Sequence, residues 1–188
     1  MSIDQLNHYL ATQNWPKAAA VLAPVVKDQR VHPSLLYNYG KVLMELQDWQ
    51  RAIDAFRRCL KRQKDHVNAQ FELGRCLIEC LEYEHALICF RNVVSRAPSD
   101  LDAWRNIGRI TMTLGHWEEA QTAWARLSED DPEAALALYR VSAELGLPDM
   151  EKRQAELLTT HPNRAAVLQA LVRVSKGSLP LTLPISKA

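Results

Sequence analysis

Residues 104–132 read WRNIGRITMTLGHWEEAQTAWARLSEDDP, and their small and bulky positions recur along the chain every 34 residues. The interval is kept by three glycines (Gly40, Gly74, Gly108), by four alanines (Ala18, Ala52, Ala86, Ala120), by the aromatic series Trp15, Trp49, Tyr83 and Trp117, and by the bulky series Leu22, Phe56, Phe90 and Trp124. A fixed period of this length is typical of stacked repeats, in which each unit buries its apolar face against its neighbours. The sequence therefore predicts an array of similar units.

Each unit contains the pattern of two amphipathic helices. Residues 34–46 place Leu36, Tyr39, Gly40 and Leu43 at i, i+3, i+4 and i+7, which is one apolar stripe of a helix. A turn follows, and a second helix is predicted from Trp49 to about residue 62. A glycine inside a helix costs about 1 kcal/mol relative to alanine, so its recurrence indicates that the two helices must approach closely there.

The pairs Tyr39-Gly40, Leu73-Gly74 and Ile107-Gly108, followed by the periodic alanines and then by Phe56, Phe90 and Trp124, resemble the tetratricopeptide repeat. The resemblance implies an all-α fold, a right-handed superhelical solenoid of antiparallel helix pairs. We expect repeat units at residues 1–32, 33–66, 67–100 and 101–134, a degenerate fifth unit at 135–162, a capping terminal helix at 163–176 and an extended, proline-containing tail at 177–188.

Several positions depart from the repeat pattern. The first unit has Leu6 where the others have glycine, and Pro24 falls inside its second helix, where the lost backbone hydrogen bond should bend or shorten the helix. In the fifth unit, Asp131 is expected to cap the first helix and Pro132 to occupy its first position. The partner of that helix, at about 149–160, is short and lacks the marker alanine and phenylalanine.

One arc of the first helix in each unit faces away from the apolar stripe. In proteins that resemble this repeat, the arc lines a concave groove. Lys41, Arg75 and Arg109 are 34 residues apart and predict a basic ladder along it, with Arg105 one turn earlier. We expect a protein or peptide segment with acidic residues and apolar anchors to bind there, through Tyr37, Asn38, Lys41, Met44, Phe71, Arg75, Ile78, Arg105, Asn106 and Arg109.

A structural alternative for the same arc stays open. Lys41 with Glu45 and Arg75 with Glu79 are i,i+4 pairs that can neutralise one another, and Asp102 can reach Arg105 from one turn above. Met44, Ile78 and Met112 can pack against the next unit instead of facing solvent. In that case the arc would have no binding role.

Composition narrows the functional classes. The 188 residues carry 23 Lys plus Arg and 22 Asp plus Glu, a formal net charge of +1, so no global basic field points to nucleic acid. The N-terminus lacks an export signal and no stretch is long and apolar enough for a membrane span, so we expect a cytoplasmic location. Catalytic triads, phosphate-binding loops and paired buried carboxylates do not emerge, which favours a protein that is not an enzyme.

The four cysteines and the strongest basic cluster have mainly structural interpretations. Cys76 and Cys80 fall on the apolar half of their helix, so reduced, buried thiols are favoured over a zinc site, and no cofactor is expected. The basic cluster, Arg57, Arg58, Lys61, Arg62 and Lys64, is favoured as a solvated convex face. Its alternative is contact with phosphate or anionic lipid.

The most direct functional interpretation is a non-enzymatic scaffold for protein–protein interaction. The alternative is that these repeats form the N-terminal module of a bacterial transferase, a sulfotransferase or glycosyltransferase, whose catalytic domain follows the tail. A third interpretation is a self-assembling structural piece. The tail either folds back on the array, enters the groove of a second copy and so causes self-association, or leads to a further domain.

Overall fold

The computed structural model describes residues 3–128 and 130–175, so the predictions for the tail at 177–188 lie outside the described residues. Within the described ranges the chain forms helices and no strands, as the periodicity predicted. The helices are α1 (Ile3–Ala11), α2 (Trp15–Val25), α3 (Pro33–Glu45), α4 (Trp49–Arg62), α5 (Val67–Glu79), α6 (Tyr83–Arg96), α7 (Leu101–Leu114), α8 (Trp117–Trp124), α9 (Pro132–Leu145), α10 (Met150–Thr160) and α11 (Arg164–Ser175).

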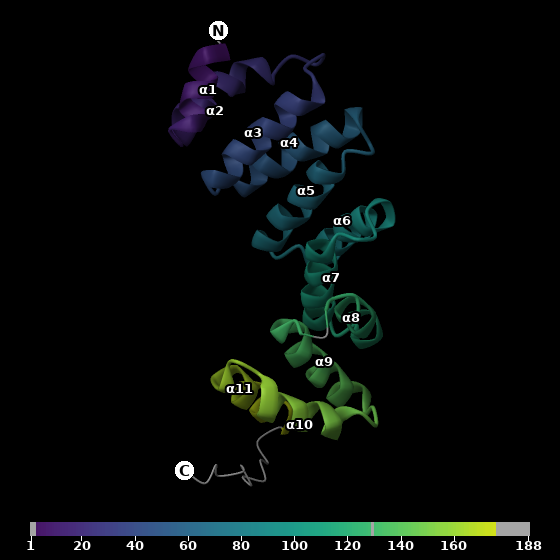
Figure 1. Cartoon of the computed structure of the whole chain (residues 1–188). Helices are drawn as coiled ribbons and strands as arrows, with labels where there is room; N and C mark the ends of the chain where they lie inside the picture. Colours follow the sequence, from purple (N-terminus) through teal and green to yellow (C-terminus); the bar gives the residue numbers. More distant parts are fainter. Residues whose placement is uncertain (1–2, 129, 176–188) are drawn as a thin grey trace. The chain divides into compact units, whose positions relative to one another are not determined.

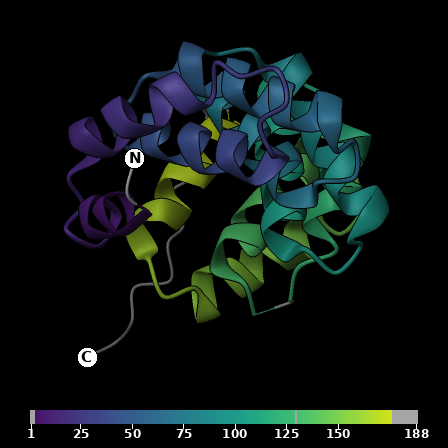
Figure 2. The same cartoon turned by 90° about the horizontal axis from the view of Figure 1, so that it is seen from above.

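The chain forms two compact parts, residues 1–110 and residues 111–188. The boundary between them lies within α7. Figure 1 shows the first part as successive helix pairs, from purple to teal. Seen from above in Figure 2, the coloured chain is again helix and short loop throughout. The predicted helix bounds agree with the observed ones to within about a residue at α3, α4, α10 and α11.

The periodic glycines make room for an aromatic ring of the second helix. A Cβ atom on Gly40 would lie 2.6 Å from Cε1 of Phe56, and one on Gly74 would lie 2.8 Å from the ring of Phe90. Both rings are fully buried. Real Cβ contacts are longer than this, so only glycine allows α3 to approach α4, and α5 to approach α6, around a filled core.

The turns inside the units share one strained position. Gln13, Gln47, Leu81 and Gly115 are 34 residues apart, and all four have a positive φ of 53°, 57°, 61° and 77°. Only the last is glycine, the residue that adopts this left-handed conformation without steric cost. The turn geometry is thus kept even where the side chain opposes it.

Histidines begin two of the first helices. The Nδ1 atom of His32 accepts a hydrogen bond from the backbone N–H of Ser34 at 3.3 Å, and Nδ1 of His66 accepts one from Ala69 at 3.1 Å. Both side chains therefore satisfy a backbone donor that a helix start leaves unpaired. Their shared place in the repeat is explained by capping.

The second helix of the first unit ends early and is held by its neighbour. α2 has 11 residues against 14 in α4 and α6, and it ends one residue after Pro24, as expected for proline inside a helix. The guanidinium of Arg58 on α4 donates to the backbone oxygen of Val26, and Arg62 donates to that of Gln29 at 2.5 Å. Two members of the basic cluster thus bind the backbone that follows α2, Arg58 at its C-cap and Arg62 in the loop beyond.

In residues 111–175 the repeat pattern weakens. α8 has only 8 residues, whereas its counterparts α4 and α6 have 14. α9 starts as predicted, with Oδ1 of Asp131 accepting from the N–H of Ala134 at 2.9 Å. A small core formed by Tyr139, Leu157, Val167 and Leu171 joins α9, α10 and the terminal helix α11.

Candidate functional site

The ten candidate residues all lie in the first part of the chain, on the first helices of three units. α3 carries Tyr37, Asn38, Lys41 and Met44, α5 carries Phe71, Arg75 and Ile78, and α7 carries Arg105, Asn106 and Arg109. We call the nine of these other than Met44 the first-helix face. Asn38, Arg75 and Arg109 are exposed, and the other six are partly buried.

A buried carboxylate joins two rungs of the basic ladder. Glu72 on α5 lies 2.6 Å from Nζ of Lys41 on α3 through Oε1, and 2.9 Å from Nη1 of Arg75 through Oε2. The side chain of Glu72 is 11% exposed, against 36% for Lys41 and 50% for Arg75. The carboxylate of Glu72 therefore holds both Lys41 and Arg75, and both cations remain accessible to solvent.

This arrangement changes the expected charge pairing. Helical spacing indicated Glu45 and Glu79 as the partners of Lys41 and Arg75, but the observed partner of both is Glu72. The interpretation as intrahelical i,i+4 pairs is wrong at these two positions. Its broader point, that the ladder is partly neutralised, is confirmed.

The aromatic members of the first-helix face are half inserted into the core. The ring of Tyr37 stacks on His66 at 5.0 Å between centroids and lies 5.9 Å from Phe56. Phe71 meets Phe90 edge to face at 5.3 Å. Burial, followed by the charge of Glu72, raises the pKa of Tyr37, so its hydroxyl stays protonated at neutral pH.

Two methionines pack inside and do not extend the face. Met44 is only 8% exposed, so the expectation that it presents apolar surface to solvent is wrong. The sulfur of Met112 accepts a hydrogen bond from the indole Nε1 of Trp124 at 3.1 Å. Met44 is therefore buried as the packing alternative expects, whereas the observed contact of Met112 is with α8 of its own unit and not with the next unit.

The α7 members are oriented by their own helix. Nη1 of Arg105 lies 2.9 Å from Oδ1 of Asp102, the contact that spacing predicted, and the Arg105 side chain is 25% exposed. Nδ2 of Asn106 donates to the backbone oxygen of Asp102 at 2.8 Å. The amide that we expected to hold a ligand backbone therefore already donates one hydrogen bond within the helix.

Sequence reasoning missed Glu72 as the organiser of this surface. On the helical wheel Glu72 shares the outward arc, which predicts an exposed acid, yet it is buried against the preceding unit. The position of Glu72 within the 34-residue repeat could have indicated its contact with the preceding unit. Glu72 stands at the position of Asn38 one unit on, so it lies next to the preceding first helix.

Burial makes two of the cysteines, Cys76 and Cys89, poor nucleophiles. Burial raises the pKa of Cys76 to about 12 and that of Cys89 to about 11, so these thiols stay protonated at neutral pH. Over residues 3–128 and 130–175 no group of three or more His, Cys, Asp or Glu side chains is arranged to hold a metal ion. Among those residues no helix is long and apolar enough to cross a bilayer.

Comparison with known sequences identifies the repeat. The family model of the tetratricopeptide repeat matches residues 3–58, 40–79 and 107–143, which together make up more than half of the chain. The chain belongs to the tetratricopeptide repeat family. No curated protein matches this tetratricopeptide repeat chain.

Solved structures share the fold. YrrB, a TPR protein with an unusual peptide-binding site, aligns with a TM-score of 0.76 and 18% identity over 89% of each chain. A tetratricopeptide repeat protein from Parabacteroides merdae gives 0.77 and 16% over 93% of this chain and 71% of its own. MamA from Desulfovibrio magneticus gives 0.70 and 20% over 93% of this chain and 91% of its own. At these identities the likeness is one of fold.

Proposed function

We propose that the chain is a non-enzymatic scaffold that binds a protein or peptide segment on the first-helix face. The preferred segment carries carboxylates together with apolar anchors. The carrying observation is the buried Glu72, which fixes Lys41 and Arg75 in place without hiding them. Cations that are already ordered lose less conformational freedom when a ligand carboxylate arrives.

Charge on the face favours an acid at its α7 end. Glu72 balances one of the two charges of Lys41 and Arg75, and the exposed Glu45 and Glu79 reduce the potential further. On α7 the position that corresponds to Glu45 and Glu79 is Thr113. Arg105 pairs with Asp102 of its own helix and its side chain is still 25% exposed, and Arg109 is exposed. Solvent therefore reaches both guanidinium groups, and a carboxylate of the partner is expected near this pair.

The apolar residues of the partner would contact the partly exposed side chains of the first-helix face. Tyr37, Phe71 and Ile78 are each partly exposed, and the two rings are held in place by contacts with core aromatics. Fixed rings offer contact area at little entropic cost, which suits one or two apolar side chains of the partner. Because exposed charge pairs contribute little individually, we expect micromolar affinity, about −8 kcal/mol.

The fold comparison supports recognition of a peptide without identifying the residues that perform it. YrrB shares the helical architecture and has a peptide-binding site. The family is built from repeated helix pairs whose faces can bind extended or helical segments.

A peptide library displayed on phage tests the proposal across many candidate segments at once. Selection on the full chain should enrich peptides that contain both carboxylates and apolar residues. The affinities of the enriched peptides are then measured by fluorescence anisotropy for the wild type and for the double variant Arg105→Ala with Arg109→Ala. We expect the double variant to bind about tenfold more weakly or worse, since it loses charge-assisted hydrogen bonds.

Lys61→Gln is the matched control, because it removes an exposed cation from α4, outside the first-helix face. It should leave affinity unchanged, and neither variant should lower the melting temperature. Enrichment of basic peptides, or equal losses in both variants, would contradict the proposal. If the double variant binds as the wild type does but is less stable, Arg105 and Arg109 have a structural role and not a binding role.

A further inference from the structure

The second part of the chain contains a pocket of about 490 Å³ that no repeat position predicts. Its walls are the segment after α8, the start of α9, and α10. The pocket follows from the shortness of α8. In α4 and α6 the helix continues for 14 residues, whereas α8 stops after 8, and the residues that follow it line the pocket instead of extending the helix. A pocket of this size suits a small molecule.

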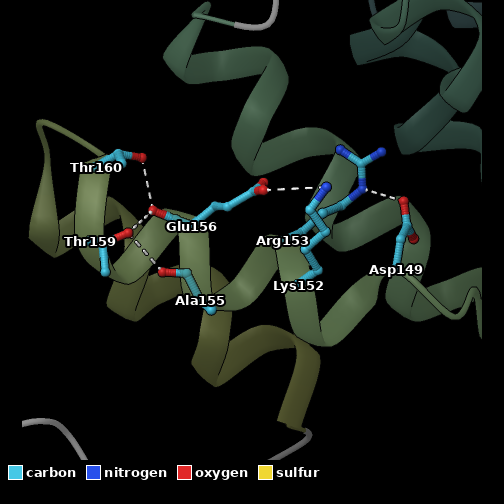
Figure 3. Close-up of polar contacts among 7 residues, drawn as sticks. All are labelled: Asp149, Lys152, Arg153, Ala155, Glu156, Thr159 and Thr160. Atoms are coloured by element: carbon cyan, nitrogen blue, oxygen red, sulfur yellow. Dashed lines mark hydrogen bonds and ion pairs between the residues drawn. The ribbon is translucent and has the colours of Figure 1, made fainter.

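Arg153 presents hydrogen-bond donors to this pocket. Its Nε atom lies 2.7 Å from Oδ2 of Asp149, an i,i+4 contact that sets the plane of the guanidinium. Figure 3 shows the two terminal nitrogens standing clear of that carboxylate. Among the residues that the structure describes, neither terminal nitrogen has a partner within bonding distance. A guanidinium held by one edge with its other edge unused matches the geometry of a carboxylate.

Three carboxylates, two cationic side chains and one histidine, His161, line the pocket. Asp130, Asp149 and Glu156 line it together with Lys152 and Arg153. Glu156 pairs only loosely with Lys152, at 3.7 Å, and these side chains are 58% and 80% exposed. The lining therefore offers donors for an anion and, one turn along α10, a carboxylate that can accept a cation. A simple anion would pair with the donors but would leave the carboxylate of Glu156 without a cationic group of the ligand.

Apolar surface lies beside the charges. Leu157, which is 4% exposed, lines the pocket together with Leu127 and Leu138. An aliphatic or aromatic group placed there would lose water contact without losing hydrogen bonds.

We propose that this pocket binds a small zwitterion with an apolar body, such as a free α-amino acid with an apolar side chain. Its carboxylate pairs with the terminal nitrogens of Arg153, its ammonium group with Glu156, and its side chain rests on Leu157. A doubly charged anion such as phosphate is disfavoured, because three carboxylates line the pocket against the two cations Lys152 and Arg153. This ligand site lies outside the first-helix face and does not depend on peptide binding there.

Calorimetric titration of the full chain separates the three recognition elements. Leucine, phenylalanine and methionine are the probes, compared with glycine, and for the tightest probe the C-terminal amide and the N-acetyl derivative are also titrated. We expect the amide, which loses the carboxylate, and the N-acetyl form, which loses the ammonium, each to bind about tenfold more weakly. Glycine and inorganic phosphate should not bind.

Two adjacent threonines on α10 provide a matched pair of variants. Thr160 lines the pocket and Thr159 does not, yet both hydroxyls donate to the backbone of their own helix and both side chains are exposed (Figure 3). Thr160→Phe should block binding, whereas Thr159→Phe should leave it intact. Arg153→Gln should weaken binding about tenfold, and Arg164→Gln, an exposed cation elsewhere, should not.

The outcomes decide the proposal. Failure of all three apolar probes to bind at millimolar concentration overturns it. Equal affinity of the zwitterion and its N-acetyl form overturns the role of the ammonium and with it the ligand class. Equal affinity of Thr160→Phe and Thr159→Phe, with both variants folded by circular dichroism, shows that any binding occurs elsewhere and also overturns it.

Discussion

Gly40 and Phe56 fit one another so closely that a single methyl group on Gly40 would lie 2.6 Å from the ring. The contact joins α3 to α4 and recurs between Gly74 and Phe90. In both cases a glycine that weakens a helix locally lets a buried ring fill the space between two helices. The 34-residue period of the sequence is thus a period of packing.

Gly40→Ala should therefore destabilise the chain although alanine favours helices. The buried ring of Phe56 must move, and overpacking of this kind costs about 1–3 kcal/mol, which exceeds the propensity gain of about 1 kcal/mol. Chemical denaturation measures the difference. In the double variant Gly40→Ala with Phe56→Leu, the smaller side chain should recover part of the loss. If Gly40→Ala is stabilising, the close contact is not what selects glycine.

Glu72→Gln should lower stability by about 1–3 kcal/mol, because Lys41 and Arg75 lose a shared, nearly buried carboxylate. Glu79→Gln on the same helix removes an exposed acid and should change stability by less than about 0.5 kcal/mol. Thermal unfolding of both variants at low and high salt tests the pair. Similar effects in the two variants would mean that Glu72 contributes no more than a surface acid.

Leu81→Gly should stabilise the chain. Leu81 has a φ of 61° and the residue is 70% exposed, so the substitution removes backbone strain and little burial. Relief of a left-handed non-glycine residue is worth about 1–2 kcal/mol, reduced by the greater freedom of glycine when unfolded. A rise in melting temperature is expected. Leu46→Gly, at a residue that is 37% exposed with φ −86°, has no such strain to relieve and should lower it.

The buried thiols make stability fall at high pH. Burial raises the pKa of Cys76 to about 12 and that of Cys89 to about 11, against an ordinary value near 9. Between these values the unfolded chain has released protons that the folded chain retains, so the free energy of unfolding decreases as pH rises from about 9 towards 12. Cys76→Ala should flatten this part of the profile in urea titrations at a series of pH values. A profile unchanged by Cys76→Ala would contradict the assignment.

The accessible thiol should be Cys80, the one cysteine that is not buried among the four. With Ellman's reagent at pH 8, we expect one fast-reacting group in the native chain and three more after unfolding. Cys80→Ser should remove the fast phase. If the fast phase persists in Cys80→Ser, one of the three buried cysteines is the reactive one and the prediction is wrong.

The helices were predictable because their signals are local and repeated. Gly40, Phe56 and Asp131 each act within one helix pair or one helix end, so a 34-residue window contains the whole argument. The pairing of the charged side chains was not predictable in the same way. A helical wheel compares residues on one helix, whereas Lys41 reaches Glu72 on the next unit, 31 residues away.

Two further features lay beyond the pattern. Met44 lies on the outward arc of a helical wheel but is only 8% exposed, and a wheel does not show what covers a position. The early end of α8 goes with a pocket that α9 and α10 also line, and no single residue encodes that space. Enclosure depends on three elements together, so it appears only in the folded chain.

The hydrogen bonds from Arg58 and Arg62 to the backbone that follows α2 also bear on how the array could be shortened. An engineered truncation that removed the first repeat would delete both acceptors at once. It would expose the guanidinium groups of Arg58 and Arg62 together with the surface of α3 that α2 covers. The shortened array would then be prone to bind anions and to self-associate. A replacement cap that supplies backbone carbonyls at the same two places would be the first requirement of any such redesign.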